Sequence, residues 1–472
     1  MSSAALDPMP VEFDPGSFRD RDSRVFVSGE HVFRALTPAA LSAWQAVAGT
    51  TFLKEALHDG SVIASEFVRD SGLTDRDGAE WAGVLQHERI PFISYPYEWC
   101  FSMLREAALL HLRLLEQGLA DGVILKDATP FNVQFRGVRP VFIDIGSFVP
   151  HQPGDAWIGY RQFCQTLLYP LMLQAHHRVD FQPSLRGRIS GITPTDFARL
   201  QSFRDWFRRG VLTHVVLHAA LESHAADADR SVARDLRSSG FDRSLILANV
   251  RKLNVVVERL KWDERRSTWS EYDAASDPVR LDGAAKEDFV RSVLAQHPGE
   301  LAWDLGCNLG RYSRIAAEHL RTVVAMDSDH WTVERLYREL QSEGDGRILP
   351  LVVNLADPSP GLGWRGMERR SLEHRGKPDV VLALALIHHL VIRENIRLDE
   401  LLEWFRSLGG RLIIEFVERD DPQVRSLLRN RSDLCPDYSR EKFDRLFAQR
   451  FEILESRPLP SSTRILFHAV PR

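Results

Sequence analysis

Residues 301–310 read Leu301-Ala-Trp-Asp304-Leu-Gly306-Cys-Asn308-Leu-Gly310, and Asp327 follows 23 residues after Asp304. A short apolar run ends in an acid and passes into a glycine-bearing turn and an amphipathic helix. A second apolar run over 322–326 then ends in another acid. This order predicts a strand–turn–helix–strand unit, whose loops form a nucleotide pocket at the carboxyl ends of parallel strands.

The residues of the turn narrow the choice of nucleotide. Gly306 and Gly310 let the backbone approach a ligand closely, and Asn308 is the non-glycine residue that best tolerates positive φ. A dinucleotide fingerprint needs a third glycine where this chain has Arg311, and Asp304 would repel a pyrophosphate. A dinucleotide is therefore disfavoured.

The two acids favour a different cofactor. Asp304 suits a cationic or amine-bearing group, while Asp327, with Ser328 beside it, is placed to accept hydrogen bonds from a ribose diol. A ligand with a ribose, a positive amino-acid tail and no phosphate fits both positions. We therefore expect S-adenosylmethionine as the cofactor.

The same residues carry a resemblance. Asp-Leu-Gly-Cys-Asn-Leu-Gly at 304–310 looks like motif I of class I methyltransferases, in the variant with Asn at its centre, and the likeness covers about residues 265–472. It implies an α/β fold with a Rossmann-like seven-stranded sheet closed by an antiparallel hairpin. In that family the residues after the third strand face the adenine, which here points to Asn354 and Leu355.

Further apolar runs fit this sheet. A strand covered on both faces is apolar throughout, as residues 379–386 are after their first acid. The other expected strands are 348–353, 411–417, and a closing pair at 451–455 and 464–468.

Two histidines follow the fourth expected strand. His388 and His389 lie where class I enzymes place substrate-facing groups, and a histidine near neutrality can act as base for a hydroxyl. The alternative is that they only cap or pack. Glu415, Glu418 and Asp420, in and after the fifth strand, are further candidates, although acids there can equally be solvated. The Asn-Pro-Pro-Tyr type of motif of amino-methylating nucleic-acid enzymes is absent.

The first half of the chain has its own pattern. Asp127 and Asn132 precede an expected hairpin over 133–143, which ends at Asp144. This resembles the catalytic segment of kinase-like phosphotransferases and implies an α+β kinase-like domain. By that resemblance Asp127 would be the base, and Asn132 and Asp144 would hold Mg²⁺ on ATP.

This half also departs from kinases. Lys126 replaces the usual Arg, no glycine-rich loop lies upstream, and Lys54 falls in a segment that reads as helix. The pattern therefore leaves three interpretations open: an active kinase, a kinase-derived but silent fold, and chance turn capping.

Composition sets outer limits. The 472 residues exceed one usual core, and 44% apolar with 26% charged residues is ordinary for globular proteins. A net charge of -5 makes nucleic acid an improbable partner, four scattered cysteines argue against a zinc ribbon or disulfide scaffold, and we expect no membrane span. We expect a cytoplasmic protein.

The expected organisation has four parts. They are a flexible arm (1–22), the kinase-like domain (23–240), a bridging helix and linker (241–282), and the methyltransferase domain (283–472). Trp269 and Tyr272 of the linker could close over the cofactor or only pack. The basic stretch 365–377 could grip phosphate, but its interleaved glutamates favour a solvated helix with internal ion pairs.

Together these features predict an S-adenosylmethionine-dependent methyltransferase, acting on an oxygen of a small molecule, saccharide or lipid-linked glycan. The whole chain is similar to nodulation-type bacterial methyltransferases. One alternative is a bifunctional kinase–methyltransferase that also uses Mg²⁺ and ATP; the other is a non-catalytic scaffold. The sequence leaves the acceptor and the oligomeric state open.

Overall fold

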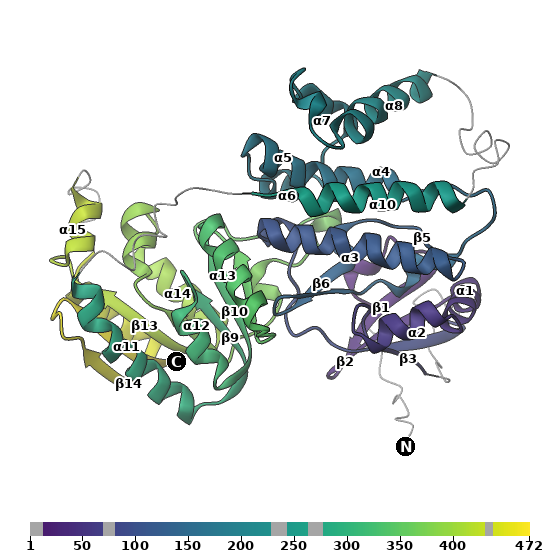
Figure 1. Cartoon of the computed structure of the whole chain (residues 1–472). Helices are drawn as coiled ribbons and strands as arrows, with labels where there is room; N and C mark the ends of the chain where they lie inside the picture. Colours follow the sequence, from purple (N-terminus) through teal and green to yellow (C-terminus); the bar gives the residue numbers. More distant parts are fainter. Residues whose placement is uncertain (1–12, 69–80, 228–242, 263–276, 430–437) are drawn as a thin grey trace.

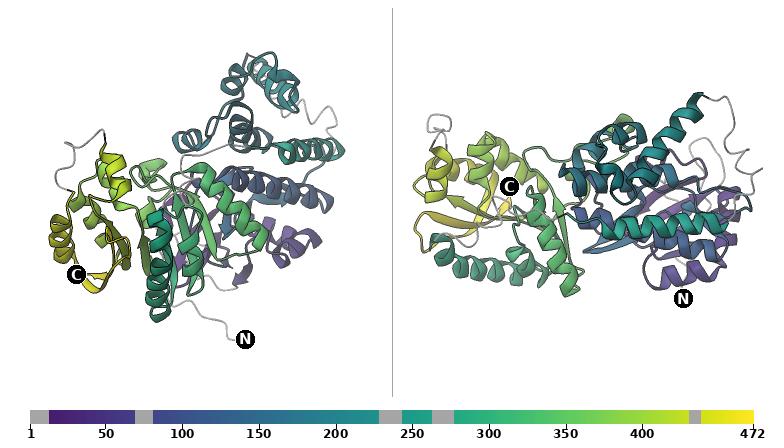
Figure 2. Two further views of the ribbon diagram at one scale, coloured as in Figure 1. Left: turned by 60° about the vertical axis from the view of Figure 1, so that its left-hand side comes forward. Right: turned by 45° about the horizontal axis from the view of Figure 1, so that its top comes forward.

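The computed structural model describes residues 13–68, 81–227, 243–262, 277–429 and 438–472. Trp269 and Tyr272 lie outside the described residues. Two parts lie side by side in Figures 1 and 2: an N-terminal part, purple to teal, and a C-terminal part, green to yellow.

The C-terminal part contains a seven-stranded sheet in the order β11-β10-β9-β12-β13-β15-β14. The first five strands are parallel, and β15 pairs antiparallel with both β13 and β14. This confirms the predicted Rossmann-like sheet with its closing hairpin. The strands are β9 (Gly299–Leu305), β10 (Leu320–Asp327), β11 (Ile348–Val352), β12 (Val380–Ala383), β13 (Arg411–Val417), β14 (Phe451–Pro458) and β15 (Arg464–Pro471).

Burial explains why these runs form strands. The side chains of β12 are buried at all four positions, and those of β13 at six of seven, as expected for a sheet covered on both faces. The covering helices are α11 (Asp277–Gln296), α12 (Arg311–Ala317), α13 (His330–Glu343), α14 (Leu398–Leu408), α15 (Pro422–Leu428) and α16 (Arg440–Arg450). Because α11 begins at 277, the end of the expected linker is helix.

The N-terminal part opens with an antiparallel sheet in the order β1-β2-β4-β3. Its strands are β1 (Ser23–Ser28), β2 (His31–Leu36), β3 (Ser65–Val68) and β4 (Gly83–His87), with α1 (Pro38–Ala48) and α2 (Thr51–His58) between β2 and β3. Residues 13–22, expected in the flexible arm, are instead packed on this sheet. Phe13 contacts Phe26 edge to face, and the Asp14 side chain caps a short 3-10 turn, Pro15–Ser17.

The rest of the N-terminal part is mainly helical. The expected hairpin is present as β6 (Val133–Arg136) and β7 (Arg139–Phe142), and a second pair joins β5 (Val123–Leu125) to β8 (Phe148–Pro150). The helices are α3 (Phe101–Ala120), α4 (Tyr160–Phe163), α5 (Tyr169–His177), α6 (Gln182–Gly187), α7 (Pro194–Arg199), α8 (Leu217–Asp227) and α10 (Arg243–Arg259). The expected bridging helix, α10, packs along α3 within this part (Figure 1).

Buried polar contacts join the two parts. Arg375 pairs with Glu98 at 2.6 Å, and both side chains are 1% exposed. The Glu334 carboxylate of α13 accepts from the backbone N–H of Ser102, and Tyr337 Oη donates to Val138 O. The two parts therefore share one buried interface. Within the described residues, every helix is too short or too polar to cross a bilayer.

The basic stretch between β11 and β12 is not the predicted solvated helix. Arg369 and Arg375 are buried, and the stretch contains two short 3-10 turns, Trp364–Gly366 and Leu372–His374, with a β-bridge between Leu362 and Arg369. The prediction was wrong because the main acidic partners, such as Glu98, lie far away in the sequence.

Candidate functional site

The loop between β9 and α12 has the backbone that its residue types predicted. Gly306, Asn308 and Gly310 have φ of 75°, 48° and 76°. The backbone N–H groups of Gly306 and Cys307 both donate to Met326 O at the end of β10. The loop is thereby fixed across the ends of two adjacent parallel strands.

Asp304 ends β9 and is 2% exposed. Ser313 Oγ donates to its carboxylate at 2.5 Å. Burial raises the pKa of Asp304 to about 7, and the nearby Asp327 charge adds to the rise. A cation beside this carboxyl would favour its charged form.

Asp327 ends the neighbouring strand, β10. Its two oxygens accept from the backbone N–H groups of Asn308 and Asp329, each at 2.9 Å. Burial raises its pKa, and those hydrogen bonds oppose the rise. Asp327 therefore holds both loops that border the site, and its remaining lone pairs can accept from a ligand.

A cavity of about 480 Å³ opens over these strand ends. Its size is typical of a small-molecule site. Eight of the predicted site residues line it: Asp304, Gly306, Asn308, Asp327, Ser328, Asn354, Leu355 and His389.

The two other predicted residues of this part, Gly310 and His388, lie outside the cavity wall. Gly310 is not in the cavity wall; it is the N-cap of α12, packed against Leu336. His388 is fully buried and also outside the wall. Burial lowers the pKa of His389 to about 4, with Arg393 contributing, so His389 is neutral at pH 7. Of the two histidines, only His389 is placed to meet a substrate.

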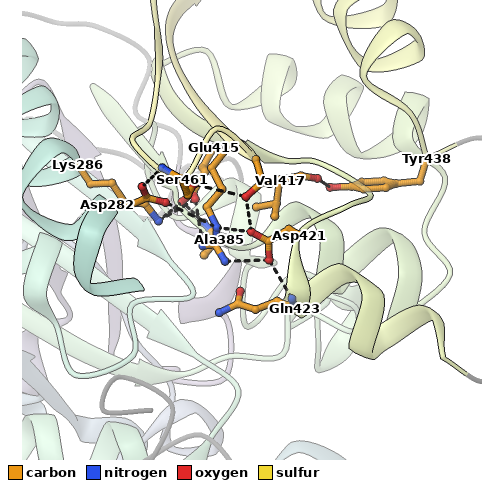
Figure 3. A network of polar contacts seen from close by, with 11 residues as sticks. Asp282, Lys286, Ala385, Glu415, Val417, Asp421, Gln423, Tyr438 and Ser461 are labelled. Atoms are coloured by element: carbon orange, nitrogen blue, oxygen red, sulfur yellow. Dashed lines mark hydrogen bonds and ion pairs between the residues drawn. The ribbon is translucent and has the colours of Figure 1, made fainter. Parts of the chain in front are cut away.

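A buried ionic network, two of whose members, Lys286 and Arg464, line the cavity, is drawn in Figure 3. Lys286 of α11 contacts both oxygens of Glu415 at 2.7 and 2.8 Å, and Ala385 N donates to the same carboxylate. Arg464 of β15 pairs with Asp421 at 2.8 Å and with Glu415 at 3.3 Å.

Lys286, Gln423 and Arg464 line the cavity, and sequence reasoning missed all three. One signal of this buried network was present in the sequence. It was a charged residue inside an apolar run: Glu415, the partner of Lys286 and Arg464, lies in Leu-Ile-Ile-Glu-Phe-Val. Three acids of the cavity wall, Asp304, Asp327 and Asp329, lie by the glycine loop, whereas Lys286 and Arg464 belong to this network.

The predicted residues of the N-terminal part also lie near one another. Asn132 Nδ2 donates to Ser147 Oγ at 3.2 Å, and Ser147 Oγ donates to Asp144 Oδ2 at 2.6 Å. Burial raises the pKa of Asp127, and the Asp144 charge contributes to the rise.

Asp144 already has a cationic partner. Its Oδ1 pairs with Arg34 of β2 at 2.9 Å, while Lys54 is exposed on α2 and donates to Gly49 O. Each Asp144 oxygen therefore already has one partner, and the Mg²⁺ site at Asn132 and Asp144 stays a prediction. Elsewhere in the described ranges, no group of three or more His, Cys, Asp or Glu is arranged to hold a metal.

No family model matches the chain. A curated relative, nodulation protein NoeA of Rhizobium meliloti (strain 1021), is 33% identical over 455 residues, covering 96% of this chain and 94% of that protein.

Among solved structures, magnesium protoporphyrin IX methyltransferase from Synechocystis PCC 6803 with bound SAH is 18% identical. The match has a TM-score of 0.30 and covers 42% of this chain and 88% of that one. N-methyltransferase NodS from Bradyrhizobium japonicum WM9 in complex with S-adenosyl-l-homocysteine is 12% identical. Its TM-score is 0.31, covering 43% of this chain and 96% of that one.

Proposed function

The chain belongs to the family of the nodulation protein NoeA, and we propose that it is an S-adenosylmethionine-dependent methyltransferase. One observation carries the proposal: Asp304 and Asp327 lie at the ends of adjacent parallel strands and line one cavity, and the loop of positive φ that follows β9 donates a backbone hydrogen bond to Asp327. An ammonium group satisfies the first acid and a ribose diol the second. The acceptor we propose is a hydroxyl oxygen of a small molecule or glycan.

The cavity residues divide the work. When bound, the cofactor supplies a methyl group on a sulfonium, open to in-line attack by the acceptor oxygen. Asp304 holds the ammonium end, Asp327 orients the ribose, and Leu355 contacts the adenine. This positioning supplies most of the rate enhancement.

His389 completes the chemistry. The acceptor hydroxyl must lose its proton as the new O–C bond forms and the S–C bond breaks. His389 lines the cavity and is unprotonated at pH 7; burial makes it a weak base, but its place in the wall lets it receive that proton. The apolar side chains of Leu384, Leu386 and Leu390 in the same wall help to exclude water from the transfer.

Isothermal titration tests the cofactor assignment. S-adenosylmethionine and S-adenosylhomocysteine are titrated into the wild-type chain and into Asp327→Asn, which keeps the side-chain shape but removes the charge. We expect the variant to bind each at least tenfold more weakly, because charge-assisted hydrogen bonds are about twice as strong as neutral ones. The control is Glu300→Gln, an exposed acid at the start of β9. Absence of binding to the wild type would overturn the proposal.

A bifunctional kinase–methyltransferase is the second candidate function. Its support is the linked pair Asn132 and Asp144 with Asp127 nearby, and the salt bridge from Arg34 opposes it. Transfer of ³²P from ATP to any acceptor, lost in Asp127→Asn, would favour it. If the chain binds neither S-adenosylmethionine nor ATP, the result favours the third candidate, a non-catalytic scaffold.

A further inference from the structure

A second cavity, of about 570 Å³, lies in the N-terminal part. Its walls come from the first sheet, from the β6–β7 hairpin and from residues 368–375 of the C-terminal part. Apolar side chains form much of the wall: Val25, Val27, Val32, Ile63, Ile90, Ile93, Phe131 and Ile143. The site is thus built by both parts of the chain, and its chemistry is not explained by methyl transfer.

Most of the charges in this wall are paired one to one. Arg34 pairs with Asp144 at 2.9 Å, and Arg370 pairs with Asp14 at 2.6 Å. Arg375 is bound by Glu98, which lies behind the wall. With the pairs Arg19–Glu368 and Arg89–Glu30, five of the six arginines that line the cavity have an acidic partner.

Arg369 is different. Its side chain is 9% exposed, and the nearest acid is Glu368, 3.9 Å away. Glu368 already accepts from Arg19 and from the backbone N–H of Trp364. Among the described residues no acceptor bonds to the guanidinium of Arg369, and its buried Nε has no partner.

The position of Arg369 is fixed all the same. Its backbone forms a two-way bridge with Leu362, and its guanidinium lies over the Phe131 ring at 5.4 Å. The buried Nε of this guanidinium loses hydration that no acceptor among the described residues replaces. An arginine fork that lines a cavity and lacks acceptors is suited to a planar or tetrahedral oxyanion.

We propose that this second cavity binds a small molecule with an apolar body and an oxyanion, and that Arg369 binds the oxyanion. The apolar body packs between the β1–β2 strands and the β6–β7 hairpin. A phosphate ester and a carboxylate share the required chemistry. The proposal does not depend on the S-adenosylmethionine assignment, because it concerns a separate cavity. Asn132 and Asp144, which the phosphotransfer alternative invokes, also line this second cavity.

Calorimetry in phosphate-free and sulfate-free buffer tests this, with pyrophosphate, ADP and citrate as probes. We expect at least one probe to bind, and Arg369→Met to weaken that binding at least tenfold. Binding of pyrophosphate or ADP alone indicates a phosphate ester, and binding of citrate alone indicates a carboxylate. The matched control is Arg365→Met, an exposed arginine of the same segment, which should bind as wild type does.

Two further measurements separate ligand binding from a structural role. Without ligand, Arg369→Met should melt no lower than wild type, because the charge it removes is buried and its nearest acid, Glu368, lies 3.9 Å away and is already bound by Arg19. With the bound probe, the wild-type chain should exchange amide hydrogens more slowly over 362–375 and 131–144. The proposal is overturned if no probe binds, if Arg369→Met binds equally well, or if that variant melts lower and the wild type shows no protection.

Discussion

Asp304 should make the folded chain less stable as the pH rises, which is the opposite of what a carboxylate with a lowered pKa does. An unfolded aspartate loses its proton near pH 4, whereas burial raises the pKa of Asp304 to about 7 in the folded chain. Between these values only the folded chain holds the proton, so unfolding releases it and the free energy of unfolding falls as the pH rises. Asp304→Asn keeps an acceptor for Ser313 but has no charge to bury. We expect it to be more stable than wild type at pH 8 by on the order of 4 kcal/mol, and nearly equal at pH 4.

Urea unfolding from pH 4 to 8 measures this difference. Glu300→Gln serves as the control, because the Glu300 side chain is 74% exposed and should contribute little at any pH. If the difference in unfolding free energy between Asp304→Asn and wild type stays constant from pH 4 to 8, the raised pKa of Asp304 is contradicted. A cation bound beside Asp304 favours its charged form. We therefore expect the affinity for the cofactor to rise as the pH passes 7 and Asp304 loses its proton.

At the residue scale, sequence reasoning succeeded where a residue's neighbours in the chain are also its neighbours in space. Asp304, Asn308 and Asp327 belong to one strand–loop–strand unit, and their pattern is local. Lys286 meets Glu415, and Arg369 lies over the Phe131 ring, across more than a hundred residues of sequence in each case, and no spacing encodes such contacts. The positive charge that meets Asp144 also comes from Arg34 on β2, while the sequence offered only Lys54.

The loop between β9 and α12 depends on a glycine for two separate reasons. Gly310 has φ of 76°, and a Cβ there would lie 2.7 Å from Leu336 Cδ1 of α13. Gly310→Ala adds backbone strain of about 1 kcal/mol and overpacking of about 1–3 kcal/mol. We expect a loss of about 2–4 kcal/mol in unfolding free energy and weaker binding of S-adenosylmethionine.

Gly409→Ala is the matched control for this prediction. Gly409 has φ of 80° at the end of α14, but a Cβ there would meet nothing within 4 Å. It should cost only the backbone strain, about 1 kcal/mol, and leave binding unchanged. Equal losses in the two variants, measured by denaturant unfolding, would show that the contact with Leu336 is unimportant.

At the element scale, the parallel strands were predictable because burial on both faces demands long apolar runs. The seven-stranded order followed from that and from the resemblance. The segment between β11 and β12 was not predictable, since its charges look like those of a solvated helix. Its shape is set by two hydrogen bonds to the N-terminal part. Ser359 Oγ donates to the Glu98 carboxylate at 2.6 Å, and Arg370 N donates to the Tyr95 hydroxyl.

At the scale of the whole molecule, one buried ion pair joins the two parts. Glu98 accepts from Arg375 through both oxygens, each at 2.6 Å, and also from Ser359 Oγ and from the backbone N–H of Tyr95. Removing one partner of such a pair leaves the other charge buried without compensation, at a cost of about 3–5 kcal/mol. We therefore expect Arg375→Met to lower the unfolding free energy by that amount and to split the thermal transition in two.

The double variant Glu98→Gln/Arg375→Met distinguishes a buried charge from lost packing. It removes both charges and should recover most of the loss, whereas a packing defect would persist. Arg186→Met is the surface control: Arg186 also links the parts, through Asp357, but the two side chains are 31% and 70% exposed. An exposed pair of this kind contributes at most about 1 kcal/mol.

Differential scanning calorimetry measures the number and the temperature of the thermal transitions of all three variants. If the ion pair couples the two parts, Arg375→Met gives two transitions, while the double variant and Arg186→Met keep one. If Arg375→Met keeps a single transition near the wild-type temperature, the parts are held together by their apolar contacts, and the second cavity does not depend on this pair for its shape.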